Sequence, residues 1–440
     1  MTGWLSNMWP STVEKQQQQF CQKELPALWD SWVAHFTEFG FAGSATARHV
    51  PSREFAALPT SVPAAERVIA IGDLHGDFRK TWRAFRLAGL IDERGRWSGG
   101  SAVCVQVGDV LDRGDQELQI FYFLERLQVE ADAHGGKLYV LNGNHETMNV
   151  STNHRYATPG AGLELLRWQQ WTALASRLRE QCSSCTKTPG PPPPLGSGSG
   201  RGGGGGAAPA AASGGQNTLY GGMHSDRTAA WRPGSPLSAR FLAPHQISLQ
   251  VGSNLFVHGG VLPSHVDYGL ERINKETQSW LLEGQALQPP NFLRGSTAIV
   301  WARDYSAEDE GRCDCDKLKQ VLKSVPGAQR MIVGHTIQEQ GVNSACGGRV
   351  VRVDVGLSRG CGDGAPQVLE ILGDSVVRRL REGAAPEVMP SGAEGAAAGD
   401  AAGRKGGAPP AAAPQPASVW RWFSGGGGSS SGGTPVASPA

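Results

Sequence analysis

The sequence lacks the features of a membrane, secreted or nucleic-acid-binding protein. No apolar run approaches the roughly 20 residues that a bilayer-spanning helix needs. Residues 1–23 are polar and rich in glutamine, without the apolar core of a secretion signal. Lys and Arg total 41 against 40 Asp and Glu, and no basic stripe favours nucleic acid. We therefore expect a cytoplasmic protein with no membrane span and no nucleic-acid partner.

Two tracts lack the large apolar side chains that a folded core requires. Residues from about 188 to 215 are almost wholly Pro, Gly, Ser and Ala, and a similar composition returns from 382 to 440. Such tracts cannot bury enough apolar surface to offset the entropy lost on ordering, so we predict that both are disordered. The predicted organisation is an N-terminal extension over 1–65, one folded domain over 66–381 that carries the first tract as an insert, and a tail over 382–440. Either tract could dock a partner.

Cysteine is sparse, and its spacing favours no single role. The eight cysteines are Cys21, Cys104, Cys182, Cys185, Cys313, Cys315, Cys346 and Cys361. Free thiols are the simplest expectation for an intracellular chain, with Cys104 inside a strand. Two close pairs, Cys182 with Cys185 and Cys313 with Cys315, leave zinc binding and redox-sensitive thiols or disulfides open.

Five short apolar runs end in clusters of Asp, His or Asn. The clusters are GDLHG at 72–76, GDVLDRG at 108–114, GNHE at 143–146, HGG at 258–260 and GHT at 334–336. One Gly-Asp pair alone could be an ordinary turn after a strand. Because a strand ends at a fixed place on the edge of a sheet, the loops after five strands can present their side chains to one site.

Six side chains in these clusters are candidate metal ligands: Asp73, His75, Asp109, Asn144, His258 and His335. Oxygen and imidazole donors without thiolates suit manganese, iron or zinc in a hydrolytic centre. Six ligands are more than one catalytic ion with an open position usually takes, so we expect two divalent metal ions that share a carboxylate. Asp109 is the candidate for the shared ligand.

Helical spacing of apolar residues follows the first three clusters. It predicts helices over 78–88, 117–134 and 163–178. Strands that alternate with helices form a largely parallel sheet with helices outside, and the later, strand-rich half of the chain can supply a second sheet. The predicted fold class is α/β, with the site at the carboxyl ends of the strands.

The order of these motifs resembles that of the phosphoprotein phosphatases within the calcineurin-like metallophosphoesterases. The segments 333–338 (VGHTIQ) and 353–358 (VDVGLS) are similar to the Shewanella-like protein phosphatases. The segments 268–274 (YGLERIN) and 313–315 (CDC) are similar to their non-chloroplast plant and algal subgroup. The resemblance spans roughly residues 66–375. It implies a four-layer α/β/β/α sandwich with a dinuclear metal site, in which 66–381 is the catalytic domain.

The resemblance also implies a role for each motif residue. Asp73, His75 and Asp109 would hold one ion, and Asp109, Asn144, His258 and His335 the other. His145 would protonate the leaving oxygen as general acid, with Asp112 as its partner. The substrate phosphate would contact Arg113, Asn144 and Arg303, and a guanidinium matches phosphate oxygens better than an ammonium does. Arg155 is a further candidate for the substrate rim, although an exposed arginine without a role explains it equally well.

The implied function is that of a metal-dependent phosphoprotein phosphatase. It would hydrolyse phosphotyrosine, phosphoserine or phosphothreonine in proteins by attack of a metal-bridging hydroxide, with manganese as the expected metal. A hydrolase of dinucleoside polyphosphates or other small phosphoesters is the alternative, because related sites serve both chemistries. A non-catalytic scaffold is disfavoured, since every implied ligand and the acid are present. The subgroup resemblance leaves a mitochondrial location open beside the cytoplasmic one.

Overall fold

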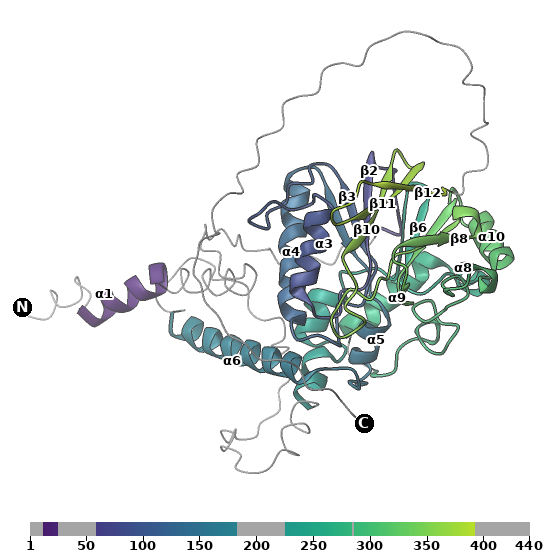
Figure 1. The fold of residues 1–440 in the computed structure, drawn as a ribbon. Helices are drawn as coiled ribbons and strands as arrows, with labels where there is room; N and C mark the ends of the chain where they lie inside the picture. The colour runs from purple at the N-terminus through teal and green to yellow at the C-terminus, as the bar shows by residue number, and fades with distance from the viewer. Residues whose placement is uncertain (1–11, 25–58, 183–224, 284–285, 392–440) are drawn as a thin grey trace, which may run out of the picture. The chain divides into compact units, whose positions relative to one another are not determined.

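The computed structural model describes residues 12–24, 59–182, 225–283 and 286–391. The predicted insert at about 188–215 and residues 392–440 of the predicted tail lie outside the described residues. Two mixed six-stranded sheets form the centre of the fold (Figure 1).

The first sheet has the strand order β12-β11-β10-β2-β3-β4. Its strands are β2 (Arg67–Ile71), β3 (Val103–Gln106), β4 (Lys137–Val140), β10 (Gln367–Leu372), β11 (Val376–Arg381) and β12 (Glu387–Met389). The second sheet has the order β1-β5-β6-β7-β9-β8. Its strands are β1 (Ser61–Val62), β5 (Ser248–Val251), β6 (Asn254–Val257), β7 (Arg330–Val333), β8 (Asn343–Ala345) and β9 (Val350–Arg352).

Each sheet contains three adjacent strands that run parallel to one another. In the first sheet β3 pairs in parallel with both β2 and β4, and in the second β7 pairs in parallel with both β6 and β9. Five of these strands are almost wholly buried, as expected for strands covered on both faces, whereas the edge strand β4 alternates between accessible and buried positions. Parallel pairing brings the carboxyl ends of three strands to one edge of each sheet, which is where ligand-bearing loops can meet.

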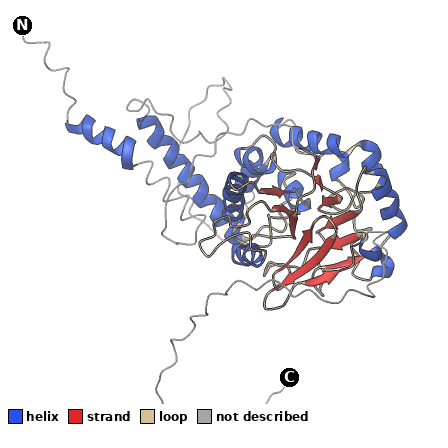
Figure 2. Ribbon diagram, turned by 90° about the horizontal axis from the view of Figure 1, so that it is seen from above, coloured by secondary structure: helices blue, strands red, loops and turns tan. Residues whose placement is uncertain are grey.

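Helices connect the strands and cover the sheets (Figure 2). The α-helices are α1 (Thr12–Gln19), α3 (Phe78–Leu87), α4 (Glu117–Ala133), α5 (Asn144–Val150), α6 (Pro159–Cys182), α8 (Pro263–Tyr268), α9 (Leu270–Glu283) and α10 (Cys315–Ser324). Short helices of other types are η1 (Phe20–Glu24), η2 (Ser238–Leu242), η3 (Asn291–Leu293), η4 (Glu310–Arg312) and η5 (Cys346–Gly348). The three predicted helices are confirmed as α3, α4 and α6. Among the described helices, none combines the length and apolarity that a bilayer crossing requires.

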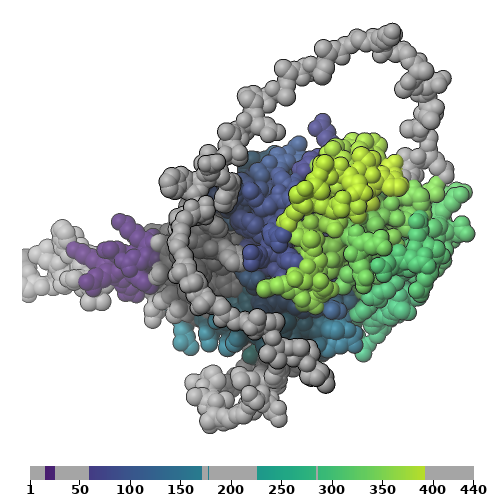
Figure 3. All heavy atoms as spheres, viewed as in Figure 1, coloured from purple at the N-terminus to yellow at the C-terminus, as the bar shows by residue number. Residues whose placement is uncertain are grey.

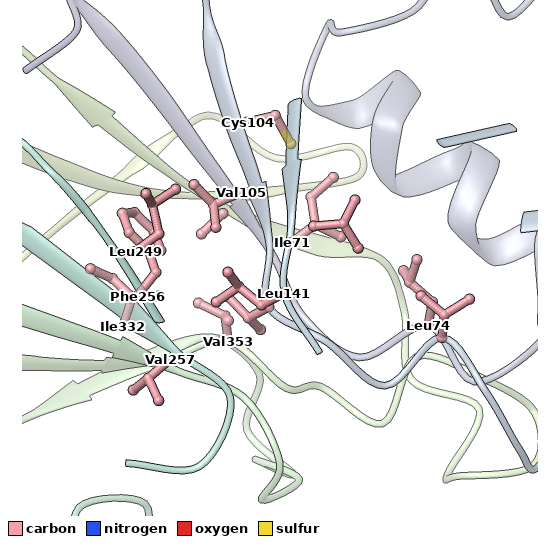
Figure 4. Close-up of a cluster of buried hydrophobic side chains, with 14 of the residues drawn as sticks. Ile71, Leu74, Cys104, Val105, Leu141, Leu249, Phe256, Val257, Ile332 and Val353 are labelled. Carbon is pink, nitrogen blue, oxygen red and sulfur yellow. The ribbon is translucent and has the colours of Figure 1, made fainter. Parts of the chain in front are cut away.

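Apolar side chains from both sheets meet in one core (Figure 4). Ile71 and Val105 come from the first sheet, and Leu249, Phe256 and Ile332 from the second, and each is at most 1% exposed. Burial of such side chains stabilises the fold by about 1.5–3 kcal/mol each. The predicted α/β fold with two sheets packed between helices is therefore confirmed.

The later half of the chain supplies most of the second sheet, as predicted, but it also contributes three strands to the first. Strands β10 to β12 return to the first sheet, where β10 pairs antiparallel with β2. Figure 3 shows these last strands in yellow beside the blue early part of the chain. A tight turn joins β10 to β11, with Gly373 and Asp374 both at positive φ. The first sheet is therefore mixed rather than parallel, because antiparallel strands extend one of its edges.

The sheets also reach beyond the limits predicted for the folded domain. The short strand β1 lies within 1–65 and pairs with β5, and β12 lies within 382–440 and pairs with β11. Both strands are only two or three residues long. Strands this short carry too little periodicity to be recognised in a sequence. The division of the chain into extension, catalytic domain and tail stays a prediction.

The cysteines depart from the expectation of free thiols. Cys315 forms a disulfide with Cys346 rather than pairing with its neighbour Cys313, which is free and buried. Cys21 is also disulfide-bonded, whereas Cys104 is a buried free thiol inside β3, as predicted. A zinc site that uses Cys315 is incompatible with this disulfide. The side chains of Cys182 and Cys185 lie outside the described residues.

Candidate active site

All six predicted ligands follow the carboxyl ends of strands. They come from the loops after five strands: Asp73 and His75 after β2, Asp109 after β3, Asn144 after β4, His258 after β6 and His335 after β7. Backbone contacts hold the first two loops together, since the N–H groups of Leu74 and His75 donate to the Asp109 carbonyl at 3.0 and 2.9 Å. The predicted convergence of the five clusters is therefore what the structure has.

Asp109 lies at the centre of the cluster. Its Oδ2 is 3.2 Å from His258 Nε2 and 3.6 Å from His75 Nε2. It belongs to both groups of side chains whose donor atoms lie within 4.8 Å of one another, one with His75 and His145 and one with His258 and His335. Asn144 Oδ1 is 2.8 Å from His258 Nε2, so Asn144 lies on the second side. A carboxylate in this position can be shared by two ions.

The glycines of the motifs allow the carboxylates to approach the backbone. A Cβ atom at Gly143 would lie 2.2 Å from Asp109 Oδ1, and a Cβ atom at Gly334 would lie 2.4 Å from Asp73 Oδ1. Both separations are far below van der Waals contact, so any other residue would displace the carboxylate. Glycine is required at these two positions because there is no room for a Cβ atom, and not because the backbone conformation demands it.

Hydrogen bonds orient two of the histidines. Nδ1 of His75 lies 2.9 Å from the Leu111 carbonyl, and Nδ1 of His258 lies 2.9 Å from the Val107 carbonyl. A carbonyl only accepts, so each Nδ1 carries a proton, and Nε2 is the nitrogen that faces Asp109. His335 Nε2 is buried without a hydrogen-bond partner among the described residues. Three imidazole nitrogens are thus prepared to bind a cation.

The carboxylates of the cluster are crowded. Burial and the nearby Asp354 and Asp109 raise the pKa of Asp73 well above its usual range, and burial raises the pKa of Asp354 to about 6. Burial also opposes the charge of Asp109, but His258 and His145 outweigh it and hold the Asp109 pKa well below its usual range. Three neighbouring buried carboxylates cannot all be ionised unless a cation compensates them. The donor set therefore fits divalent metal ions.

The pKa values of the histidines agree with metal binding. Burial lowers the pKa of His75 to about 4 and that of His335 to about 2. Both rings are neutral near pH 7, which is the form that binds a metal. For His258 the effect of Asp109 outweighs burial and raises the pKa, so a cation would compete with a proton at that ring.

Asp354 is a member of the cluster that the motif reading missed. It follows β9, its side chain hydrogen-bonds with that of Asp73, and it accepts the N–H of Gly356 at 2.9 Å. A weaker form of the same signal is present at 350–354, where a run of valines interrupted by Arg352 ends in Asp354. Treating this sixth run as a strand would have identified Asp354 as a further candidate ligand.

His145 is held by a buried network. Its Nδ1 lies 2.6 Å from Asp112 Oδ2, and its Nε2 faces Asp109 Oδ2 at 3.9 Å. Arg227 donates to Asp112 Oδ1 at 3.1 Å and to both oxygens of Glu117 at 2.7 and 2.8 Å. Burial disfavours the charged imidazole, but Asp109 and Asp112 outweigh burial and raise the pKa of His145.

Arg227, Glu117 and Glu146 are further residues that the motif reading did not assign. Arg227 is 1% exposed and also donates to Asn149 Oδ1 at 2.6 Å. Glu146, the last residue of the GNHE motif, accepts the backbone N–H groups of Asp109, Val110, Leu111 and Gly143 at 2.7–3.1 Å. It thereby fixes the loop that carries Asp109. Glu146 could have been found from its motif, whereas Arg227 lies in no motif.

Backbone strain is concentrated in these loops. Nine described residues other than glycine have positive φ, and five of them are His75, Asp109, Asp112, Arg113 and His335. Such conformations cost roughly 1–3 kcal/mol each and persist where the surroundings enforce them. The loops are therefore shaped for the placement of their side chains rather than for local stability.

Arg113 and Arg303, the two arginines predicted to bind phosphate, lie near the cluster. The guanidinium of Arg113 lies over the Tyr156 ring at 4.7 Å from its centroid, and the buried Arg113 Nε has no hydrogen-bond partner among the described residues. Burial lowers the pKa of Arg303, against the opposite effect of Asp109, Asp354 and Asp73. Both arginines are thus close enough to the cluster to meet an anion bound there. Arg155 also lies over the Tyr156 ring, at 4.8 Å.

The fold and this donor set resemble those of the calcineurin-like metallophosphoesterases. The family model of the calcineurin-like phosphoesterases matches residues 66–183. The fold is shared with a cold-active protein tyrosine phosphatase of known structure, at a TM-score of 0.51 and 20% sequence identity over 76% of this chain and 81% of that chain. A protein tyrosine phosphatase from a psychrophilic Shewanella species gives a TM-score of 0.50.

Sequence similarity places the chain more narrowly. It is 42% identical over 358 residues to Shewanella-like protein phosphatase 2 of Arabidopsis thaliana, which is 81% of this chain and 88% of that relative. Shewanella-like protein phosphatase 1 of Plasmodium berghei is 39% identical over 93 residues, 21% of this chain and 26% of that relative. The chain therefore belongs to the Shewanella-like protein phosphatases, a family of metal-dependent hydrolases of phosphomonoesters, and the resemblance seen in its motifs is confirmed.

Proposed function

We propose that this phosphatase removes phosphate from protein side chains with His145 as general acid and with Arg113 and Arg303 as phosphate ligands. The observation that carries the proposal is the His145–Asp112 pair, which stands against Asp109 at the centre of the donor cluster. Phosphotyrosine, phosphoserine and phosphothreonine are all candidate substrates.

The metal ligands in this proposal are those of the two sides of Asp109. Asp73, His75 and Asp109 would hold one divalent ion, and Asp109, Asn144, His258 and His335 the other, with Asp354 supporting Asp73. Bound ions would neutralise the phosphate and lower the pKa of a water toward neutrality. Manganese is the metal we expect, and iron and zinc have compatible ligand preferences.

His145 is suited to protonate the leaving oxygen of the phosphorylated side chain. The carboxylate of Asp112 accepts the Nδ1 proton, so the second proton of the imidazolium sits on Nε2, which faces the cluster. The raised pKa keeps more of the ring protonated at neutral pH. Arg227 and Glu117 do not reach the substrate in this scheme, and they hold Asp112 in place.

Arg113 and Arg303 are suited to bind the phosphate oxygens. Among the described residues neither has an ion-pair partner, and the closest carboxylates that act on Arg303 belong to the metal cluster itself. A planar guanidinium can donate two parallel hydrogen bonds to a phosphate. In this proposal Asn144 would contact the phosphate through its amide as well as the second ion.

An assay of the full chain tests this function. The protein is stripped with a chelator, reloaded with manganese, iron or zinc, and supplied with phosphotyrosine, phosphoserine and phosphothreonine peptides or with a dinucleoside tetraphosphate. We expect no turnover after stripping, recovery on reloading that is greatest with manganese, and preference for phosphopeptides. Turnover of the dinucleotide alone would instead assign the chain to small phosphoesters, and full turnover after stripping would refute the metal site.

A further inference from the structure

Tyr156 organises two arginines at the entrance of the site. The guanidinium carbons of Arg113 and Arg155 lie 4.7 and 4.8 Å from the centroid of the Tyr156 ring, and that ring is centred 5.2 Å from the His145 ring. The tyrosine is half-buried and Arg155 is exposed. One aromatic ring thus links the general acid, a phosphate ligand and an arginine with no part in the scheme above.

The loop that carries Tyr156 is tied to the loop that carries Arg113. The Arg113 N–H donates to the Tyr156 carbonyl at 2.9 Å. The Thr158 hydroxyl lies 3.0 Å from the Gly114 carbonyl and 2.6 Å from Asp115 Oδ1. These contacts fix the ring relative to the phosphate position, so Arg155 is held at a defined distance from it.

The charge of Arg155 is not used within the described part of the chain. No carboxylate there lies within ion-pair distance of Arg155, whereas the comparably exposed Arg359 is paired with Asp77 at 3.3 Å. Stacking on the ring orients the guanidinium and leaves its N–H edge accessible. An oriented, unpaired guanidinium beside a phosphate site is a receptor for a second anion.

We propose that Arg155, stacked on Tyr156, binds an acidic side chain close in sequence to the phosphorylated residue, so that the enzyme prefers acidic phosphopeptides. The inference rests on the proposed function, because it extends the phosphate site formed by Arg113. The two guanidinium carbons share one ring and can be no more than 9.5 Å apart. An extended peptide advances by roughly 3.3–3.6 Å per residue, so the partner carboxylate belongs to a residue within about two positions of the phosphorylated one.

Paired phosphopeptides test the subsite. Each pair has the same sequence, with Glu or Gln within two positions of the phosphorylated residue, and kcat and KM are measured for both members. For the wild-type enzyme we expect kcat/KM to be about fivefold higher for the Glu peptide, the size of one exposed ion pair. The preference should lie in KM and should fall as salt rises, because exposed charges are screened.

Four variants locate the effect. Arg155→Ala should bring the ratio of the two kcat/KM values close to one and remove its salt dependence, and Arg155→Lys should give an intermediate ratio. Tyr156→Phe retains the ring and should retain the ratio. Arg167→Ala, at an exposed arginine on α6, should behave as wild type in every assay. Circular dichroism and metal content confirm that each variant is folded and loaded.

The outcomes separate the subsite from the function on which it rests. A wild-type ratio near one, or an unchanged ratio in Arg155→Ala, would refute the subsite while phosphopeptide hydrolysis itself stands. If the wild-type enzyme hydrolyses neither peptide but still hydrolyses a small phosphate ester, the proposed protein substrate fails instead. A preference that is lost equally in Arg155→Ala and Arg167→Ala would assign it to general surface charge and would also refute the subsite.

Discussion

The two sheets contribute unequally to the active site. On the side of the first sheet, Asp112 contacts His145 and Arg227, and Arg227 contacts Glu117, so the polar groups satisfy one another. On the side of the second sheet, His335 Nε2 is buried without a hydrogen-bond partner among the described residues. The protein alone positions His145, the proposed acid, whereas His335 has a nitrogen, free of partners in the described part of the chain, that a group from outside the chain can bind.

Substitutions of His145 and His335 should have the largest effects on activity, and the two variants should differ in metal content. His145→Asn removes the acid but leaves the predicted ligands, so we expect kcat to fall by about 10²–10⁴-fold with unchanged metal content. His335→Asn should lose metal as well as activity. Steady-state kinetics and elemental analysis of both variants measure the difference. Loss of metal in His145→Asn would make that histidine a ligand and would reverse the comparison.

The buried arginine of the first-sheet side should matter most for stability. Arg227→Met leaves Glu117 without its counter-charge, and removal of one partner from a buried ion pair typically costs about 3–5 kcal/mol in the free energy of unfolding. Urea unfolding measures this cost. The exposed Arg232 supplies the control, since Arg232→Met should change stability by less than about 0.5 kcal/mol.

A double variant distinguishes charge from packing at the same position. If Arg227→Met is destabilising because Glu117 is left charged and buried, then Glu117→Gln in the same chain should restore part of the loss. An Arg227→Met variant as stable as wild type would show that the network does not support the fold. In either case the pH profile of the remaining activity reports on Asp112 and His145.

The second-sheet side has a covalent link in place of such a network. The disulfide between Cys315 and Cys346 joins the start of α10 to η5 across a sequence separation of 31. Replacing both cysteines by alanine should lower the free energy of unfolding by about 2–4 kcal/mol, because the unfolded chain regains the freedom of that loop. Wild-type protein in reductant also loses the disulfide of Cys21, so it should unfold at a urea concentration no higher than that of this variant. Cys361→Ala removes a free thiol and should have a smaller effect, and equal midpoints for all proteins would contradict the prediction.

Local sequence patterns predict part of the active site, whereas contacts between distant parts of the chain could not be predicted. The positions of the candidate ligands after β2, β3, β4, β6 and β7 were predictable because each follows an apolar run, and local sequence determines where a strand ends. Arg227 was not, because it contacts Glu117 across 110 positions of sequence and lies after the insert. The return of β10 to the first sheet is likewise a long-range pairing. Side-chain partners that depend on tertiary packing leave no local pattern to read.

A pH-dependent effect is expected at Glu164, which supports the first-sheet side through α4. Its carboxylate accepts the N–H groups of Leu118 and Gln119 at 2.8 and 3.0 Å, and burial raises its pKa to about 8 from an ordinary value of 4.5. Between these values the folded state holds a proton that the unfolded state has lost. The stability that Glu164 contributes is therefore complete below pH 4.5 and is lost as the pH rises through about 8.

Substitution of Glu164 by glutamine tests this sign. The amide cannot ionise, so Glu164→Gln should be more stable than wild type at about pH 9, and the difference should shrink toward about pH 5. Urea unfolding at the two pH values measures it, with Glu93→Gln as a control at a side chain that is 91% exposed. A wild-type advantage that grows with pH would mean that the Glu164 carboxylate is stabilised as an anion by the two N–H groups. In that case the hydrogen bonds from the N–H groups of α4, rather than burial, would determine the charge of the Glu164 carboxylate. The first-sheet side would then hold one more buried anion than we infer.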